Sequence, residues 1–377
     1  MHYEQIIIGA GSMGSAAAYF LGKAGKRVLL IDAHHPPHTE GSHHGETRLI
    51  RFAYGEGERY VPFVLRAKQL WDELAVISGK ANFLQTGIVN VGEANDPFIQ
   101  GVERASDQYN LPLQKLTASE LMEKFPGMQI PPHLIGLYEP SSGVMLTEAC
   151  IESYIEQACK YDVTKKFDTK IKQIEIEEGI VKVYSENGEC YTADHCICTV
   201  GAWAKELLEK TGIILPMQPT RKTFAWFEAD ESIYGDMRYP GFTFQFHHES
   251  YYGFPSIDGK GLKIGRHDTG QPINPNDEKT AFGLVDHEQQ ELEQFLHTYM
   301  PQVGKLIEGK TCMYAMTPDE DFIIDQHPIY PQITFAAGFS GHGFKFASAV
   351  GEALSELAQG METTIDLSAF TFARFNR

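Results

Sequence analysis

The sequence has little of what an exported, membrane-spanning or nucleic-acid-binding protein needs. Its 377 residues include six cysteines, which for this length is not a disulfide framework. No apolar run reaches the roughly 18 residues that a membrane span requires. Basic residues number 32 against 50 acidic ones, and the net charge of −18 disfavours nucleic acid and anionic membranes as partners. We therefore expect a reduced, cytoplasmic protein in which individual Arg or Lys side chains hold any anionic ligand.

What is present is the composition of an ordinary soluble globular protein. Hydrophobic residues make up 42% and charged residues 22% of the chain. The length predicts about two domains.

The first 32 residues carry the most informative local pattern. They predict a buried strand over residues 5–8, a helix over 15–23 and a second buried strand over 27–31. Gly9, Gly11 and Gly14 form a GxGxxG motif, in which the glycines allow a tight turn, the approach of a pyrophosphate and close helix–strand packing. Asp32 ends the second strand, where a carboxylate accepts hydrogen bonds from ribose hydroxyls. The unit predicts dinucleotide binding without separating NAD from FAD.

The remaining pattern predicts an α/β fold (α+β overall) in two parts. Helices are expected over 61–78 and 147–161, strands over 181–185 and 191–200, and a second strand–glycine loop–helix unit over 333–358. Short strands rich in Phe and Tyr over 221–266 predict an antiparallel sheet. We assign residues 1–80, 147–220 and 310–377 to a discontinuous Rossmann-like nucleotide-binding domain, and 81–146 and 221–309 to a substrate domain with a mainly antiparallel sheet.

Basic residues between positions 41 and 57 are candidates for anion binding. Arg48 and Arg51 are three residues apart, so on a helical turn they share a face and can grip a carboxylate or phosphate. The alternative is two solvated surface arginines. His43 and His44 are adjacent, point apart and have no nearby third ligand, so we expect no metal site.

Several other residues have a plain structural interpretation beside a functional one. Lys263 alternates with Gly265 along a strand and points either inward or to solvent. Lys345 begins a helix and could be a surface charge. Cys312 lies between a basic and an acidic turn and, taken alone, is most simply a buried apolar thiol. Cys196 and Cys198 share one face of a predicted strand and are expected to be core residues.

Read together, several segments resemble one family of flavoproteins over essentially the whole chain. The segments are GAGSMG, GSHHGETRLIR, YYGFP, GLKIG, TPDEDFIID and GFSGHGFKFAS. They are similar to those of the monomeric sarcosine oxidase and N-methyltryptophan oxidase family. The resemblance implies FAD rather than NAD, joined covalently through its 8α-methyl group to the sulfur of Cys312.

The same resemblance implies roles for individual residues. Arg51 and Lys345 would hold the substrate carboxylate, and Tyr252 and His267 would line the substrate pocket. Lys263 would stand where oxygen is reduced. The remaining cofactor-binding residues implied by the match are Ser42, His44, Arg48, Gly341 and Gly343.

One position departs from the sarcosine-specific pattern. Sarcosine oxidases of this family carry a methionine nine residues before the second Tyr of YYGFP, and here that position is Thr243. A smaller residue leaves room for a larger substrate side chain.

The resemblance therefore implies a monomeric FAD-dependent oxidase, and we expect no metal. Its partners would be an N-methyl amino acid and molecular oxygen, and its products the primary amino acid, formaldehyde and hydrogen peroxide. The alternatives are an oxidase of another amino acid, of the pipecolate, proline or glycine type, and a non-catalytic dinucleotide-binding protein.

Overall fold

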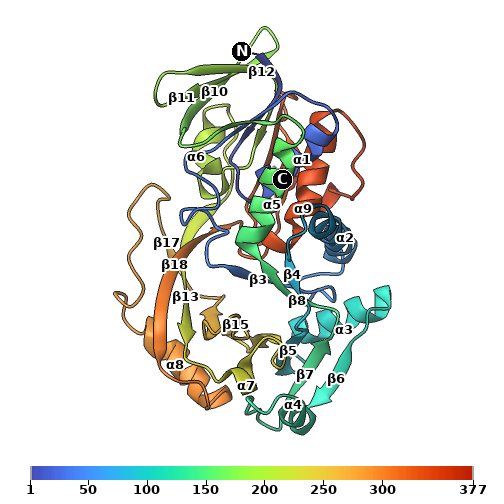
Figure 1. Cartoon of the computed structure of the whole chain (residues 1–377), viewed down its shortest axis with the longest axis vertical. Helices are drawn as coiled ribbons and strands as arrows, with labels where there is room; N and C mark the ends of the chain where they lie inside the picture. Colours follow the sequence, from blue (N-terminus) through green and yellow to red (C-terminus); the bar gives the residue numbers. More distant parts are fainter. Residues whose placement is uncertain (1, 376–377) are drawn as a thin grey trace.

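The computed structural model describes residues 2–375 and shows an elongated molecule in two parts, each built on its own large sheet (Figure 1). The first part contains an eight-stranded sheet in which β10, β11, β12, β1, β2 and β9 follow one another, while β20 pairs with β12 and β19 with β20. Its strands are β1 (His2–Ile8), β2 (Val28–Ile31), β9 (Thr164–Lys166), β10 (Ile171–Glu177), β11 (Ile180–Ser185), β12 (Cys190–Cys198), β19 (Ile323–Gln326) and β20 (Ile333–Ala337). Strands β20, β12, β1, β2 and β9 pair with one another in parallel, and β9 forms one edge of the sheet.

Helices from distant parts of the sequence cover this sheet together. They are α1 (Ser12–Lys23), α2 (Tyr60–Ser78), α5 (Thr147–Cys159) and α9 (Ala347–Ala358). The packing of α1 on α9 is close because its facing residues are small: a Cβ at Gly351 would stand 2.4 Å from the Cβ of Ala16. A single apolar cluster joins all four helices. This explains why glycine loops at the two ends of the chain belong to one nucleotide-binding unit.

The second part is a nine-stranded sheet with the order β17-β13-β16-β15-β14-β5-β7-β6, and β18 pairs with β13. All pairs are antiparallel except β14 with β5. Its strands are β5 (Ile88–Glu93), β6 (Gln114–Thr117), β7 (Leu134–Glu139), β13 (Gln218–Phe227), β14 (Gly241–Gln245), β15 (Ser250–Phe254), β16 (Leu262–Arg266), β17 (Gln271–Pro272) and β18 (Leu306–Met316). The predicted mainly antiparallel sheet is confirmed.

One face of this second sheet is mainly apolar, and at its edge Arg221 and Arg266 form ion pairs with α8 (Glu288–Tyr299). Alternate residues such as Phe242, Phe244 and Ile264 pack against α4 (Ala118–Lys124) and α8. Because successive strand residues point to opposite sides, the intervening residues lie on the other face. Beside that face runs a small sheet of β3 (Thr47–Ile50), β8 (Gly143–Leu146) and β4 (Phe83–Leu84). The remaining helices include α3 (Pro97–Tyr109), α6 (Ala204–Glu209) and α7 (Glu231–Tyr234).

Local predictions hold where the periodicity is strong. The helices predicted over 61–78 and 147–161 are α2 and α5, and the strands predicted over 181–185 and 333–337 are β11 and β20. The suggestion that Arg48 and Arg51 share a helical turn is wrong: Arg48 lies in β3, and Arg51 follows its end. The domain division stays a prediction, although β18 runs across its boundary at 309/310.

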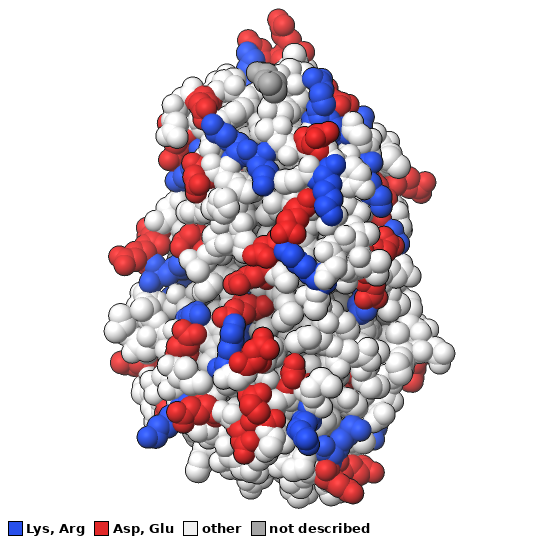
Figure 2. Space-filling view, in the orientation of Figure 1, with Lys and Arg blue, Asp and Glu red and all other residues white. Residues whose placement is uncertain are grey.

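The visible surface carries acidic and basic side chains interspersed, with acidic ones more numerous (Figure 2). Within residues 2–375, no helix has both the length and the apolar character of a membrane span.

Candidate active site

A cavity of about 620 Å³ lies where the glycine loops of the first part meet the second sheet. This volume is within the range of cofactor and ligand sites, roughly 300–1,000 Å³. Of the predicted cofactor-binding residues, the structure places seven in its lining: Gly9, Gly11, Asp32, Ser42, Arg48, Gly341 and Gly343. The cavity extends from Asp32 at the end of β2 to Tyr314 in β18.

The backbone around the GxGxxG motif explains its glycines. Gly9 has φ +97°, and a Cβ there would stand 2.4 Å from the carbonyl oxygen of Thr199. Gly14 does not line the cavity; a Cβ on it would meet the carbonyl oxygen of Gly9 at 1.8 Å. Gly14 therefore lets α1 pack on the loop, and Gly9 and Gly11 leave the cavity open to a phosphate at the start of the helix.

Asp32 is held in place by the loop it faces. Its carboxylate accepts hydrogen bonds from the backbone N–H of Ala10 at 2.6 Å and of His34 at 2.9 Å. Burial opposes ionisation, but hydrogen bonds from His38, His34 and Ala10 keep the pKa of Asp32 below its ordinary value. A carboxylate with lone pairs remaining on both oxygens, at the edge of the cavity, fits a ribose diol. The glycine loop at the start of α1 and Arg48 would hold the phosphates, so the lining of this cavity fits the FAD dinucleotide.

Four of the other predicted site residues, Thr243, Tyr252, Lys263 and Cys312, share the open face of the nine-stranded sheet. The strand register places Asn90 beside Thr243 and Thr243 beside Tyr252. It also sets Lys263 between Phe254 and Trp226. Two strands further, Cys312 lies opposite Lys222. All of these positions alternate with the apolar residues that pack on α8, so they project from the face turned away from that core.

Lys263 is buried, with 2% of its surface exposed, which excludes the solvated alternative. Its ammonium donates hydrogen bonds to the carbonyl of Gly45 and, at 3.1 Å, to Thr47 Oγ1. It also lies 4.6 Å from the ring centroids of both Phe224 and Phe254. Burial and the nearby Arg48 lower its pKa well below the ordinary value. Backbone, hydroxyl and aromatic groups thus surround this amine, and an anion beside it would be stabilised strongly.

Arg51 and Lys345 meet at one aromatic ring. The guanidinium carbon of Arg51 and the Nζ of Lys345 each lie 5.2 Å from the ring centroid of Tyr54. Lys345, in η2 (Phe344–Phe346), is buried and donates hydrogen bonds to Tyr54 Oη at 3.2 Å and to the carbonyl of His342 at 2.9 Å. It is therefore not a surface charge. Burial and the proximity of Arg51 lower the pKa of Lys345 to about 7.

The guanidinium of Arg51 is only partly satisfied. Its Nη2 pairs with Glu56 at 2.6 Å, whereas Nε and Nη1 are buried without a hydrogen-bond partner among the described residues. Buried donors of a cation without an acceptor are costly. A ligand carboxylate would relieve that cost.

Tyr252 and His267 stand together near this cation pair. Their ring centroids are 6.5 Å apart, and His267 lies 5.5 Å from the ring of Tyr314, which lines the large cavity. Burial and the neighbouring Lys222 lower the pKa of His267 to about 3, and burial raises that of Tyr252 to about 12. Both side chains are therefore neutral near pH 7.

Cys312 is buried in β18, two residues from Tyr314 and on the same strand face. It is not itself in the lining of the large cavity. Burial raises the pKa of the thiol, while Arg48 and Lys263 oppose that shift. His44 lies near the same cluster, its ring 5.9 Å from that of Phe224, and burial together with Lys310 lowers its pKa to about 4. Cys196 and Cys198 are buried in β12, as expected of core residues.

Three residues near the site were not identified from the sequence: Tyr54, Glu56 and Lys222. Lys222 is buried and donates a 2.6 Å hydrogen bond to the carbonyl of His267, and burial lowers its pKa to about 8. The available signal was weak: Lys222 lies two residues before Phe224 on one strand face, but its neighbours Arg221 and Thr223 are polar too. Glu56 was hidden in a glycine loop. Within residues 2–375, no group of three or more His, Cys, Asp or Glu side chains is arranged to hold a metal.

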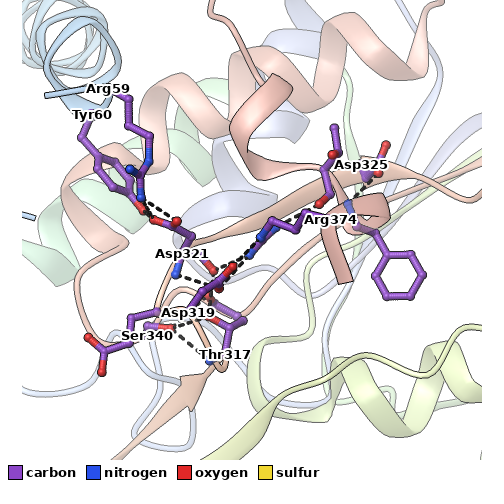
Figure 3. A network of polar contacts seen from close by, with 12 residues as sticks. Arg59, Tyr60, Thr317, Asp319, Asp321, Asp325, Ser340 and Arg374 are labelled. Atoms are coloured by element: carbon purple, nitrogen blue, oxygen red, sulfur yellow. Dashed lines mark hydrogen bonds and ion pairs between the residues drawn. The ribbon is translucent and has the colours of Figure 1, made fainter. Parts of the chain in front are cut away.

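The acidic turn over residues 317–321, which follows β18, holds neighbouring segments together (Figure 3). Asp321 pairs with Arg59 at 2.5 Å and accepts a hydrogen bond from Tyr60, at the start of α2. Thr317 N–H bonds Ser340 Oγ at 3.1 Å, inside the second glycine loop. The turn thereby fixes the glycine loop and α2 against β18, the strand that carries Cys312.

Comparisons with known proteins agree with this geometry. Residues 5–357 match the family described as FAD dependent oxidoreductase. The chain is 42% identical over 376 residues to a monomeric sarcosine oxidase from Bacillus sp. (strain NS-129), covering 99% of this chain and 97% of that protein. It is 41% identical over 378 residues to an N-methyl-L-tryptophan oxidase from Salmonella newport (strain SL254), covering all of both.

Solved structures share the fold at lower identity. NikD, described as an unusual amino acid oxidase, matches with a TM-score of 0.87 at 20% identity, covering 98% of this chain and 97% of that one. L-proline dehydrogenase from P. horikoshii matches with a TM-score of 0.87 at 22% identity, covering 100% and 98%.

Proposed function

Because the chain belongs to the family of FAD-dependent oxidoreductases, in the group of the monomeric sarcosine and N-methyl-L-tryptophan oxidases, we propose that it oxidises the N-methyl group of an N-methyl amino acid. One N-methyl amino acid, one oxygen and one water would give the primary amino acid, formaldehyde and hydrogen peroxide. When bound, FAD supplies the two-electron oxidation chemistry that no amino-acid side chain performs. We also propose that the protein acts as a monomer in the cytoplasm.

The observation that carries this proposal is the pair of buried basic side chains at Tyr54. In a chain of net charge −18, Arg51 and Lys345 each lie 5.2 Å from the ring centroid of Tyr54. Among residues 2–375, two buried donors of Arg51 have no acceptor. A non-catalytic dinucleotide-binding protein has no use for such a site. An amino acid carboxylate fits it, because guanidinium groups bind carboxylates bidentately.

The surrounding residues favour a reactive form of the amine. The two arginines near the site, Arg48 and Arg51, stay charged and disfavour a protonated substrate amine, because like charges lower its pKa. Neutral Tyr252 and His267 can hydrogen-bond the uncharged amine without adding to that repulsion. Orientation by the carboxylate clamp then presents the methyl group to the cofactor.

An anaerobic bleaching screen tests the function. N-methyl-L-tryptophan, sarcosine, pipecolate, proline and glycine are each mixed with the holoenzyme without oxygen, and loss of the flavin colour is followed. Formaldehyde and peroxide are measured after oxygen is admitted. We expect N-methyl amino acids to bleach the flavin. Bleaching by pipecolate, proline or glycine alone would favour the alternative oxidase, and no bleaching at all would contradict the proposal.

The covalent tether gives a first prediction. We propose that Cys312 holds the flavin, because it is a buried thiol on the same strand face as Tyr314, which lines the large cavity. Acid-precipitated wild type should keep its yellow colour in the pellet, and Cys312→Ser should release it. Cys190→Ser, at an exposed cysteine, is the control and should behave as wild type. Flavin found wholly in the wild-type supernatant contradicts the tether.

The substrate side chain gives a second prediction. Thr243 lies beside Tyr252 in the sheet and donates a 2.8 Å hydrogen bond to Asn90 Oδ1. We propose that this small residue admits bulky substrates, so wild type should prefer N-methyl-L-tryptophan to sarcosine in kcat/KM. Thr243→Met should shift the ratio toward sarcosine by about 10- to 200-fold at most, the range of a methylene-scale pocket change.

Thr243→Val is the matched control, since it keeps the shape and removes only the hydroxyl. Its preference should stay near that of wild type. A wild type with a strong preference for sarcosine would rule out the bulky-substrate reading.

A further inference from the structure

A second cavity, of about 190 Å³, borders Lys263 and shares no lining residue with the large one. It lies between the start of α5 and the ends of β15 and β16. Its inner wall includes Lys263, Trp226 and Phe254. The proposed amine oxidation, in which Arg51 and Lys345 bind the substrate, does not use it.

Lys263 stands between the two cavities. Its Nζ lies 3.1 Å from Thr47 Oγ1, 4.6 Å from the ring centroid of Phe254 and 5.3 Å from that of Trp226, and all three residues line the second cavity. A third ring, that of Phe224 at 4.6 Å, belongs instead to the cluster of Cys312 and Tyr314. Tyr314 lines the large cavity. One buried amine therefore separates the second cavity from the cofactor side.

The inner wall of the second cavity suits a small apolar molecule, and its mouth is charged. Leu146, Ala149 and Ile257 line it beside Trp226 and Phe254. The exposed residues Glu148, Asp258 and Lys260 line its outer end, where Lys260 pairs with Glu46 at 2.9 Å. Apolar cavities in proteins stay dry and take up gases such as xenon. At roughly 30 Å³ per water molecule in the liquid, the volume holds several molecules of oxygen size.

We propose that this second cavity is the route by which molecular oxygen reaches Lys263, separate from the site that binds the amino acid. The inference rests on the proposed oxidase function. Each oxygen would take two electrons from the reduced FAD and two protons, and leave as hydrogen peroxide. The cavity supplies passage only: its apolar wall favours the gas, and its charged end offers the peroxide a polar exit.

Filling the cavity tests the route without touching the carboxylate clamp. Ala149 is half-buried in α5, so Ala149→Phe places a ring in the cavity while keeping the helix. The bound FAD is reduced by light and mixed with oxygen in a stopped-flow instrument, which needs no substrate. We expect the second-order rate constant of reoxidation to fall by about tenfold or more, because a close-packed interior offers few other voids. The rate of anaerobic reduction by substrate should stay near that of wild type, because the variant leaves Arg51 and Lys345 untouched.

Two further variants and one structural readout complete the test. Ile257→Trp blocks from another wall and should act in the same way, and Ala149→Ser, which leaves the cavity open, should reoxidise as wild type does. Crystals of wild-type holoenzyme under xenon should show the gas between Trp226 and Phe254, and crystals of Ala149→Phe should not.

Unchanged reoxidation in both blocked variants would overturn the route, and so would the absence of xenon from the wild-type cavity. Failure of the proposed function looks different. In that case no N-methyl amino acid bleaches the flavin, while the light-reduced measurement still decides the route.

Discussion

Replacing Arg51 with alanine should weaken the binding of a carboxylate-bearing substrate by roughly 30- to 4000-fold. Removing one partner of a desolvated charge pair costs about 2–5 kcal/mol, and every 1.4 kcal/mol is a factor of ten. The guanidinium is buried, and its Nε and Nη1 have no acceptor within the described part of the chain. The substrate carboxylate would be that acceptor. We therefore expect Arg51→Ala to lose the whole of this interaction.

Arg51 should matter more than Lys345 near neutral pH. Burial and Arg51 itself lower the pKa of Lys345 to about 7, so a large fraction of this lysine is uncharged at pH 7 in the absence of ligand. An arginine stays charged throughout. The standing positive charge that attracts the carboxylate is therefore mainly that of Arg51.

The comparison of an acid with its methyl ester makes the measurement specific. Dissociation constants for both are obtained by anaerobic titration of the flavin spectrum. Wild type should prefer the acid strongly, and Arg51→Ala should lose most of that preference. Arg104→Ala, at an exposed arginine paired with Glu58, is the control and should change neither value. An equal loss for acid and ester would remove Arg51 from carboxylate binding.

The positions of Arg48 and Arg51 could not be predicted from the local sequence alone. Three-residue spacing suggested a common helical face, but Arg48 belongs to β3, which pairs with β8 almost a hundred residues later. That pairing is a long-range contact and leaves no periodic trace in a short segment. The result is that Arg48 faces the large cavity and Arg51 faces Tyr54.

Hydrophobic periodicity did predict the elements that are determined by residues close together in the sequence. The strand–glycine loop–helix unit at Gly9–Gly14 and the helix α2 could be predicted because each is a local pattern with one amphipathic or close-packed solution. The face shared by Thr243, Tyr252 and Lys263 needed the register of separate strands. Lys222 was missed for the same reason: its importance comes from lying opposite Cys312, ninety residues away.

Lys263→Met should slow the reaction of reduced enzyme with oxygen by at least about 100-fold, the scale seen when one preorganised electrostatic group is removed. Reducing oxygen creates negative charge. The buried amine of Lys263 lines the second cavity and lies 4.6 Å from the ring centroid of Phe224, which packs with Cys312 and Tyr314. Burial and Arg48 hold its pKa low in the resting protein. A negative charge that develops beside Lys263 raises the pKa of its amine again. The ammonium that results stabilises the negative charge by the same free energy.

The substrate half of the reaction should respond much less, since it transfers a hydride equivalent from a neutral amine and needs the charge of this lysine less than the reduction of oxygen does. Stopped-flow measurement of both halves separates the two effects. Lys310→Met is the matched control: Lys310 also lies over the Trp226 ring, at 4.7 Å, but it pairs with Glu308 at 3.1 Å and is partly exposed. Its loss should leave both rates near wild type. If Lys263→Met were reoxidised at the wild-type rate, the buried amine would serve only to tie β16 to Gly45 and Thr47.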